Sequence, residues 1–297
     1  MTPLFDLHCD TLYEIYKKKV SFDSSSLHVS NAKIFSYNPY VQICAIWSDY
    51  RLSNDVAFQN YKNCLEYSRN VGFDFTVSKR QLLLSVEDAR LLNGYLTRLD
   101  QLYDDGTVSL TLNWKGESCI GGGWNTTSPL TPFGIDVITR CCEKRIAVDL
   151  SHSSYEVQVQ ALNLAEHYNI SPIFSHSNSY TICNHKRNLT DDIAKEIANR
   201  NGLIGLSMCC EHISNKKPAT IYDVIKHASH FLSLGCGSCL ALGCDFDGIS
   251  ALPIGISGVD DLAKLYVLFT KEFGTIVAND IFYNNSHKYF SKLLEGR

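Results

Sequence analysis

Two histidines occur in the same local pattern, each directly after a short apolar run. Residues 145–150 lead into Ser-His152-Ser, and residues 171–174 lead into Ser-His176-Ser. Apolar, β-branched runs of this length are typical of strands that are buried on both faces of a parallel sheet. Residues 155–170 separate the runs and carry apolar side chains at helical spacing, which is long enough for a right-handed crossover. We therefore expect both imidazoles at the carboxyl ends of neighbouring parallel strands, where α/β proteins bind ligands and metals.

Carboxylates and a third histidine follow other strand-like runs. His8 and Asp10 stand two residues apart in the apolar N-terminal run, so a strand there places both on one face, within reach of one metal ion. Glu87 comes directly after a run of leucine and valine, and a carboxylate buried there needs a cationic partner or a raised pKa. Asp245 follows a further apolar run. Each pattern alone is weak, because a single strand-end residue is more often a hydrogen-bonded structural group.

Eight segments have the composition of strands, and most are followed by segments with helical periodicity, residues 91–102 among them. The expected strands are residues 4–10, 41–47, 81–87, 107–114, 145–150, 171–174, 202–208 and 239–248. We predict an α/β fold in which residues 1–297 form a single (β/α)8 barrel of the TIM type, because eight such units match its usual size. A doubly wound open sheet is the alternative, but it normally shows a switch-point loop, which the sequence lacks.

Composition and charge argue against several classes of protein. Of the 297 residues, 45% are hydrophobic and 20% are charged, as in ordinary soluble domains, and the formal net charge of −4 argues against a nucleic-acid partner. The N-terminus lacks the basic segment of a signal peptide, and no run approaches the roughly 20 apolar residues of a membrane-spanning helix. We therefore expect a cytoplasmic protein without a membrane partner, whose 12 cysteines are reduced thiols. Cys236 and Cys239 form a lone CxxC pair, which is weak grounds for a zinc ribbon or a redox motif.

Six side chains are expected to project from the same rim of such a barrel. They are His8, Asp10, Glu87, His152, His176 and Asp245. Three imidazoles with carboxylates suit zinc or a similar first-row ion. Six potential ligands exceed the four of one tetrahedral site, and two metals about 3.5–4 Å apart, bridged by a carboxylate and a water, use them better. Such a pair lowers the pKa of a bound water and steadies a developing oxyanion, so the pattern predicts hydrolytic chemistry.

Eight short motifs occur together along the chain. They are Asp6-Leu-His8-Cys-Asp10, Ser85-Val-Glu87, Leu130-Thr-Pro-Phe-Gly, Val148-Asp-Leu-Ser-His152, Phe174-Ser-His176-Ser, Arg187-Asn-Leu-Thr-Asp-Asp, Gly243-Cys-Asp245-Phe-Asp247-Gly and Ile281-Phe-Tyr-Asn-Asn. With them the chain resembles, over nearly its whole length, the membrane (renal) dipeptidases, which are peptidase family M19 of the amidohydrolase superfamily. The motifs are specific only in combination.

The resemblance implies a barrel with a binuclear zinc centre that hydrolyses dipeptides and tolerates a D-residue at the C-terminal position. His8 and Asp10 would then hold one zinc ion, and His152 and His176 would hold the other. Glu87 and a water or hydroxide would bridge the two Zn²⁺ ions. The resemblance also implies a small dipeptide as the partner molecule and a homodimer as the assembly.

Two further roles follow from the resemblance alone. Asp245 would shuttle a proton between the bridging hydroxide and the leaving amine. Arg187 would clamp the carboxylate of the substrate, a task that suits its planar guanidinium.

The chain departs from the family where animal members carry a substrate-polarising histidine after the fourth strand. Here the sequence reads Asn113-Trp114, as in a bacterial branch, so the oxyanion would rely more on metal and the substrate could differ. The same chemistry on another amide, a lactam or a lactone therefore remains an alternative. A non-catalytic, metal-carrying protein on the same barrel is the third hypothesis.

Overall fold

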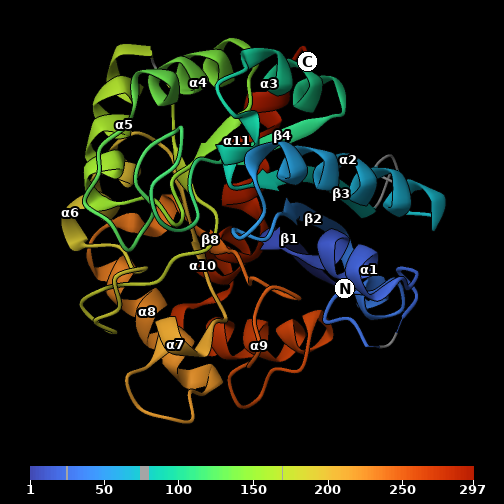
Figure 1. Ribbon diagram of the computed structural model, residues 1–297. Coiled ribbons are helices and arrows are strands. Elements are labelled where there is room, and N and C mark those ends of the chain that lie inside the picture. The colour runs from blue at the N-terminus through green and yellow to red at the C-terminus, as the bar shows by residue number, and fades with distance from the viewer. Residues whose placement is uncertain (25, 74–79, 169) are drawn as a thin grey trace.

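The computed structural model describes residues 1–24, 26–73, 80–168 and 170–297, in which parallel strands close into a barrel in chain order (Figure 1). The strands are β1 (Thr2–Cys9), β2 (Tyr37–Trp47), β3 (Arg80–Glu87), β4 (Thr107–Thr111), β5 (Ala147–Asp149), β6 (Ile173–Phe174), β7 (Leu203–Leu206) and β8 (Leu240–Leu242). The last strand pairs with the first, with Asp6 opposite Leu242. This closure confirms the predicted (β/α)8 barrel and excludes the open sheet.

Helices surround the barrel and connect most of its strands (Figure 1). They are α1 (Thr11–Lys18), α2 (Asn54–Asn70), α3 (Leu96–Asp104), α4 (Pro132–Glu143), α5 (Tyr155–Tyr168), α6 (Asp191–Asn199), α7 (Cys210–Ile213), α8 (Ile221–Ser233), α9 (Leu262–Phe273), α10 (Thr275–Asn279) and α11 (Asn285–Leu294). Local sequence fixes their ends: Thr131 accepts a hydrogen bond from the Gly134 amide to cap α4, with Pro132 at its first position. None of the helices in the described ranges has the length and apolar content needed to cross a membrane.

The predicted helix over residues 91–102 is wrong in its extent. The chain forms a short 3₁₀ turn, Ala89–Leu92, and α3 begins only after a break. Within the break, Asn93 and Gly94 have φ values of 49° and 82°, in the left-handed region that ends a right-handed helix. Helical periodicity alone did not reveal this interruption.

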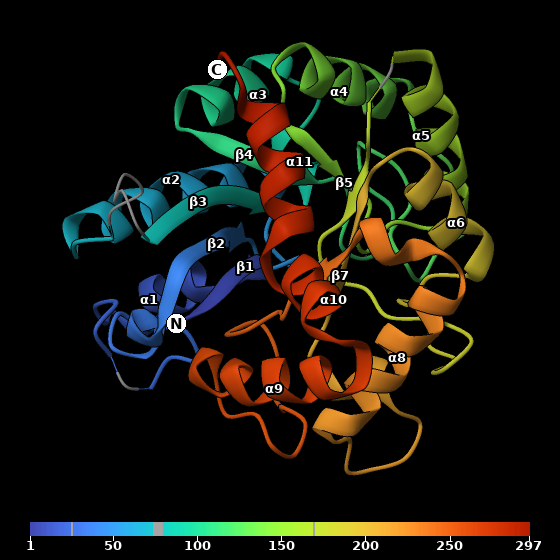
Figure 2. The same ribbon diagram turned by 180° about the vertical axis from the view of Figure 1, so that it is seen from behind.

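Apolar side chains fill the barrel interior, and α11 closes its N-terminal end. The filling consists of Phe5, Leu7, Val41, Ile43, Val108, Ala147, Ile173, Leu203, Ala241 and Phe290. Phe290 comes from α11 and stacks on Phe5, with ring centroids 5.4 Å apart. Figure 2 shows α11 lying across this end of the barrel. The strand ends that carry the predicted site residues lie at the opposite end.

Two glycines allow the end of β6 to pack closely against its neighbours. A Cβ atom at Gly205 in β7 would lie 1.9 Å from the carbonyl oxygen of Ser175, and one at Gly243, just after β8, would lie 1.6 Å from the same oxygen. Neither distance is possible for a real side chain, and the clashing atom belongs to the backbone. Because His176 is the next residue after Ser175, these glycines also set the position of that imidazole.

We predict that Gly243→Ala lowers the free energy of unfolding by about 2 kcal/mol or more, because the new methyl group must displace backbone. Guanidinium denaturation measures the change. Gly237→Ala is the matched control, since its nearest foreign atom would be a Leu232 methyl carbon at 3.5 Å, and it should stay within about 0.5 kcal/mol of wild type. Equal stability of the two variants would show that the close approach is not a constraint.

Candidate metal centre

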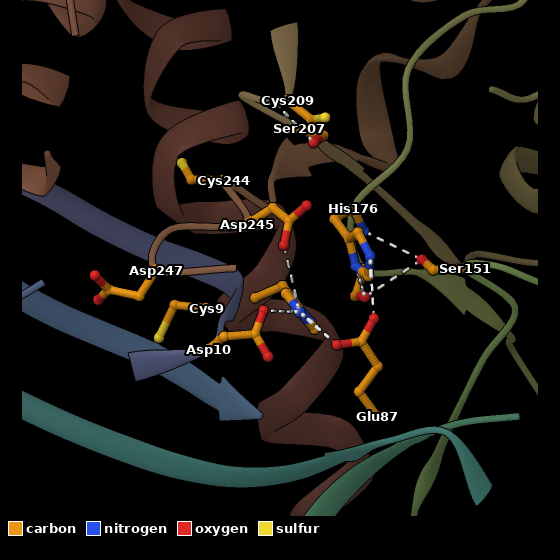
Figure 3. A network of polar contacts seen from close by, with 12 residues as sticks. Cys9, Asp10, Glu87, Ser151, His176, Ser207, Cys209, Cys244, Asp245 and Asp247 are labelled. Atoms are coloured by element: carbon orange, nitrogen blue, oxygen red, sulfur yellow. Dashed lines mark hydrogen bonds and ion pairs between the residues drawn. The ribbon is translucent and has the colours of Figure 1, made fainter. Parts of the chain in front are cut away.

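The six strand-end residues meet at the C-terminal end of the barrel (Figure 3). His8 lies in β1, Asp10 directly follows it, Glu87 ends β3, His152 and His176 follow β5 and β6, and Asp245 follows β8. All six side chains are at most 12% exposed. In Figure 3 the labelled members Asp10, Glu87, His176 and Asp245 point toward a common space.

The Glu87 carboxylate contacts His8 through one oxygen and His152 and His176 through the other. Its Oε2 is 3.6 Å from Nε2 of His8, whereas its Oε1 is 3.0 Å from Nε2 of His152 and 3.7 Å from Nε2 of His176. Each oxygen therefore faces different imidazole nitrogens. A carboxylate in this position can bridge two cations.

Two more carboxylates surround His8. Asp10 Oδ2 is 3.5 Å and Asp245 Oδ1 is 3.9 Å from Nε2 of His8. Burial and the charge of Asp10 raise the pKa of Glu87 to about 7, and burial raises the pKa of Asp245 well above its ordinary value. Three buried carboxylates at this spacing repel one another, so the cluster favours bound positive charge.

The unpaired ligand atoms of this cluster fit divalent cations. Nε2 of His8 and Oδ1 of Asp10 are buried without a hydrogen-bond partner. Nε2 of His152 lies 2.8 Å from Nε2 of His176, an approach that is favourable only with a proton or a cation between the nitrogens. Burial lowers the pKa of both histidines well below the usual value, which favours the neutral, metal-binding form.

The backbone is left-handed at two of the site residues. His152 has φ of 65° and Asp245 has φ of 63°, values that are unusual for residues with a Cβ atom. In both cases the strand has just ended, and the turn directs the side chain to the centre of the rim. Such conformations are often found at functional sites, where surrounding contacts hold them in place.

A hydrogen-bond chain from Asp149 orients His176. The Asp149 carboxylate lies 2.6 Å from the Ser175 hydroxyl, which lies 2.8 Å from Nδ1 of His176. Asp149 also accepts hydrogen bonds from the hydroxyl of Thr111 and the amides of Ser151 and Ser175. In the arrangement that uses every donor, Ser175 donates to the Asp149 carboxylate and accepts from Nδ1–H of His176. The chain therefore leaves Nε2 of His176 with a free lone pair toward the site.

A cavity of about 370 Å³ opens over the cluster and is lined by Asp10, Glu87, His152 and Asp245. Arg187 lines the same cavity although its side chain is buried. One guanidinium nitrogen of Arg187 donates to the backbone oxygen of His176 over 3.3 Å, while Nε has no partner. Burial lowers the pKa of Arg187, so an anionic ligand would stabilise its charge. The structure thus places Arg187 beside the six rim residues.

The sequence analysis missed an aromatic wall on one side of this cavity. The Trp114 ring stacks on Tyr50 at 5.4 Å and on His152 at 5.8 Å, and it packs against Trp47 at 5.3 Å. Trp47 ends β2, so the rule of strand-end residues could have found it. Asn113 turns away from the cavity and contacts the hydroxyls of Ser118 and Ser153.

A histidine pair was also missed. His185 and His212 line the cavity near Arg187, with ring centroids 4.6 Å apart. Burial is the main cause that lowers the pKa of His212 to about 2, so its imidazole is neutral. Both residues lie outside the strands, in the loop after β6 and in α7, where no periodic pattern marks them.

Comparison with known proteins decides the family. The model of the membrane dipeptidase family (peptidase family M19) matches residues 57–288. The chain belongs to this family. Two uncharacterized dipeptidases of Schizosaccharomyces pombe are 30% and 31% identical to it over 213 and 204 residues, or 69% and 65% of this chain. The matches cover 50% and 47% of those proteins, so the chain spans about half the length of these relatives.

Solved structures of metallopeptidases share the fold. The dipeptidase AC of family M19 superposes with a TM-score of 0.86 at 19% identity, over 98% of both chains. A metallopeptidase from Rhodobacter sphaeroides, bound to a phosphinate mimic of L-Ala-D-Ala, superposes with a TM-score of 0.88 at 17% identity, over 98% of this chain and 99% of the other. The family membership confirms the resemblance seen in the motifs.

We predict that Ser175→Ala weakens metal binding at this site about 10- to 100-fold, because His176 loses the contact that fixes its ring and tautomer. Metal counting after dialysis against graded chelator measures this, independently of any activity. Ser177→Ala is the control, since the Ser177 hydroxyl is buried without a hydrogen-bond partner. Equal metal retention by both variants would contradict the role of the chain from Asp149.

Proposed function

We propose that this protein is a dipeptidase that uses two divalent metal ions, zinc being the expected metal, to hydrolyse the peptide bond of dipeptides. The observation that carries the proposal is the Glu87 carboxylate, with one oxygen facing His8 and the other facing His152 and His176. Two-metal hydrolases hold their ions around such a shared carboxylate. Membership of the membrane dipeptidase family supports the same activity.

The donor set fits the two ions. His8 and Asp10 would hold one, His152 and His176 the other, and Glu87 would bridge them. When bound, the ions lower the pKa of a water and stabilise negative charge on the oxygen of the scissile carbonyl.

Arg187 would bind the C-terminal carboxylate of a dipeptide. Its guanidinium lies in the wall of the cavity, is held on one side by the His176 backbone, and keeps Nε free. A planar guanidinium binds a carboxylate through two hydrogen bonds, which positions the ligand as well as binding it. Substrates with a free carboxylate at a fixed distance from the scissile bond would therefore be preferred.

Asp245 would move the proton. It lines the same cavity, and its Oδ1 lies 3.9 Å from Nε2 of His8. A carboxylate at the reacting atoms can accept the proton of the attacking water and deliver it to the leaving amine. The left-handed backbone of Asp245 holds the group in that position.

The cavity and one neighbour bear on the substrate. A volume of about 370 Å³ lies in the range of small-molecule sites and accommodates a dipeptide. The Rhodobacter sphaeroides metallopeptidase with the same fold binds a phosphinate mimic of L-Ala-D-Ala. We include dipeptides with a C-terminal D-residue among the substrates on this basis.

The aromatic wall favours a second candidate function, the same chemistry on a lactam or a lactone. Trp114 presents an indole ring beside His152, where a flat cyclic amide or ester could stack. The hydrogen bonds of Asn113 to Ser118 and Ser153 keep its amide away from such a ring.

Zinc-loaded protein is expected to release free amino acids from a panel of L-L and L-D dipeptides, measured by amino-acid chromatography. Chelation should abolish the activity and added zinc should restore it. Asp245→Asn with the same metal content controls for contaminating peptidases, and its kcat should fall by about 10²- to 10⁴-fold. Turnover of lactams or lactones without turnover of any dipeptide would replace the first candidate by the second.

Arg187→Ala should raise KM for dipeptides about 10- to 100-fold, because a charge-assisted hydrogen bond to the carboxylate is lost. Dipeptide amides, which lack that carboxylate, should be affected little. Steady-state kinetics on both substrate types measures the difference. Lys115→Ala removes another cation at the edge of the cavity and should leave KM within about twofold. A parallel rise in KM for dipeptides and amides would rule out the clamp.

A further inference from the structure

A second cavity lies at the other end of the barrel. It has a volume of about 560 Å³ and is wedged between α11 and the starts of β5, β6 and β7. Figure 2 shows this end of the barrel, with α11 crossing in front of the strands. The plug formed by Phe290 separates it from the metal centre. Nothing in the dipeptidase proposal uses this cavity.

The charged groups that line this second cavity are all cations. They are Arg145, Lys288 and Lys292. The described residues of the lining include no aspartate or glutamate. None of the three cations forms an ion pair with any residue that the structure describes. Lys288 and Lys292 stand four residues apart on α11, a spacing at which like charges repel. An anion between them would remove this repulsion.

Arg145 adds a cation at a position where the backbone favours glycine. It follows α4 with φ of 54° and closes the helix with a hydrogen bond from its amide to Cys142. The corresponding residues after α3 and α8 are Gly106 and Gly235, as is usual for this left-handed turn. Asn201, after α6, is likewise not glycine, has φ of 55°, and also lines the cavity. Asparagine is also common in this conformation, so Arg145 is the residue that the backbone does not favour.

The rest of the lining suits an organic ligand. Ile146, Ile170, Pro172 and Leu293 provide apolar surface, and the Tyr289 ring lies beside them. Its hydroxyl is held by a 2.5 Å hydrogen bond to the carbonyl of Ser171, so the ring is fixed in place. A fixed aromatic and aliphatic floor under a ring of cations matches a molecule with an apolar body and an anionic group.

We propose that this second cavity binds a small organic anion, an apolar or aromatic body bearing a phosphate or carboxylate group. Arg145, Lys288 and Lys292 bind the anionic group, and the apolar floor holds the body. The site is separate from the metal centre and its existence does not depend on the reaction performed there.

Isothermal titration of zinc-loaded protein with phenyl phosphate and with benzoate tests the proposal and distinguishes the two anionic groups. We expect saturable binding of at least one, weakened roughly tenfold or more in an Arg145→Gln, Lys292→Gln double variant, since charge-assisted contacts are lost. The matched control is Lys62→Gln, Lys271→Gln, which removes two exposed cations elsewhere and should bind as wild type does. Phenol, the neutral analogue, should bind at least tenfold more weakly than phenyl phosphate.

A second measurement locates the ligand. Acetylation of lysines followed by mass spectrometry should show protection of Lys288 and Lys292 by the bound anion, and none of Lys271. Binding that is absent, that is entirely unchanged in the double variant, or that protects neither lysine overturns the proposal, whereas a component that persists in the double variant and leaves both lysines unprotected belongs to the metal centre. Failure here would leave dipeptide hydrolysis unaffected, because that assay probes the opposite end of the barrel.

Discussion

Repulsion among buried carboxylates is the constraint on which this structure depends. Asp10, Glu87 and Asp245 all lie within 4 Å of Nε2 of His8, at a rim where little water can screen their charges. The ligand atoms of His8, Asp10 and Asp245 lie within 4.8 Å of one another, and two like charges about 4 Å apart repel by about 4 kcal/mol at an effective dielectric constant of 20. Folding that brings them together is favourable only if protons or bound cations neutralise part of this charge. The arrangement of ligands is thus a consequence of electrostatics as much as of shape.

Hydrogen bonds and close backbone packing around His176 hold that arrangement in place. Asp149 is itself a buried carboxylate, but it accepts hydrogen bonds from four donors. One of these donors, the Ser175 hydroxyl, also contacts Nδ1 of His176 and so orients its ring. Gly205 and Gly243 allow the backbone around Ser175 to pack without side chains. Substitutions at Asp149, Gly205 or Gly243 would therefore displace His176, although none of these residues is expected to contact a ligand itself.

The repeated pattern of an apolar run followed by a polar residue predicted both the barrel and its rim. His152 and His176 follow strands of only three and two residues. Their positions were predicted from the apolar composition of these runs and the Ser-His-Ser sequence that follows each, because the strands are too short to be recognised by length. The break at Asn93 was not predictable from periodicity, because asparagine and glycine also occur inside amphipathic segments. His185 and His212 could not be found either, since they come together only through the folding of two irregular segments. The sequence pattern identifies the side chains at the end of a strand, whereas the positions of loop residues depend on long-range packing.

The seam between β8 and β1 has a consequence for how the protein forms. A single pair, Asp6 opposite Leu242, joins these strands, supplemented by the contact of Cys9 with Phe246 beyond them. Residues 8 and 245 therefore come together only after the last strand of the barrel, β8, has been synthesised. A nascent chain carries parts of the site long before it can complete it, which delays tight capture of metal until the cylinder has closed. Assembly of the centre would then be a late step that reinforces one of the two joints, with β5–β6, that a single residue pair forms.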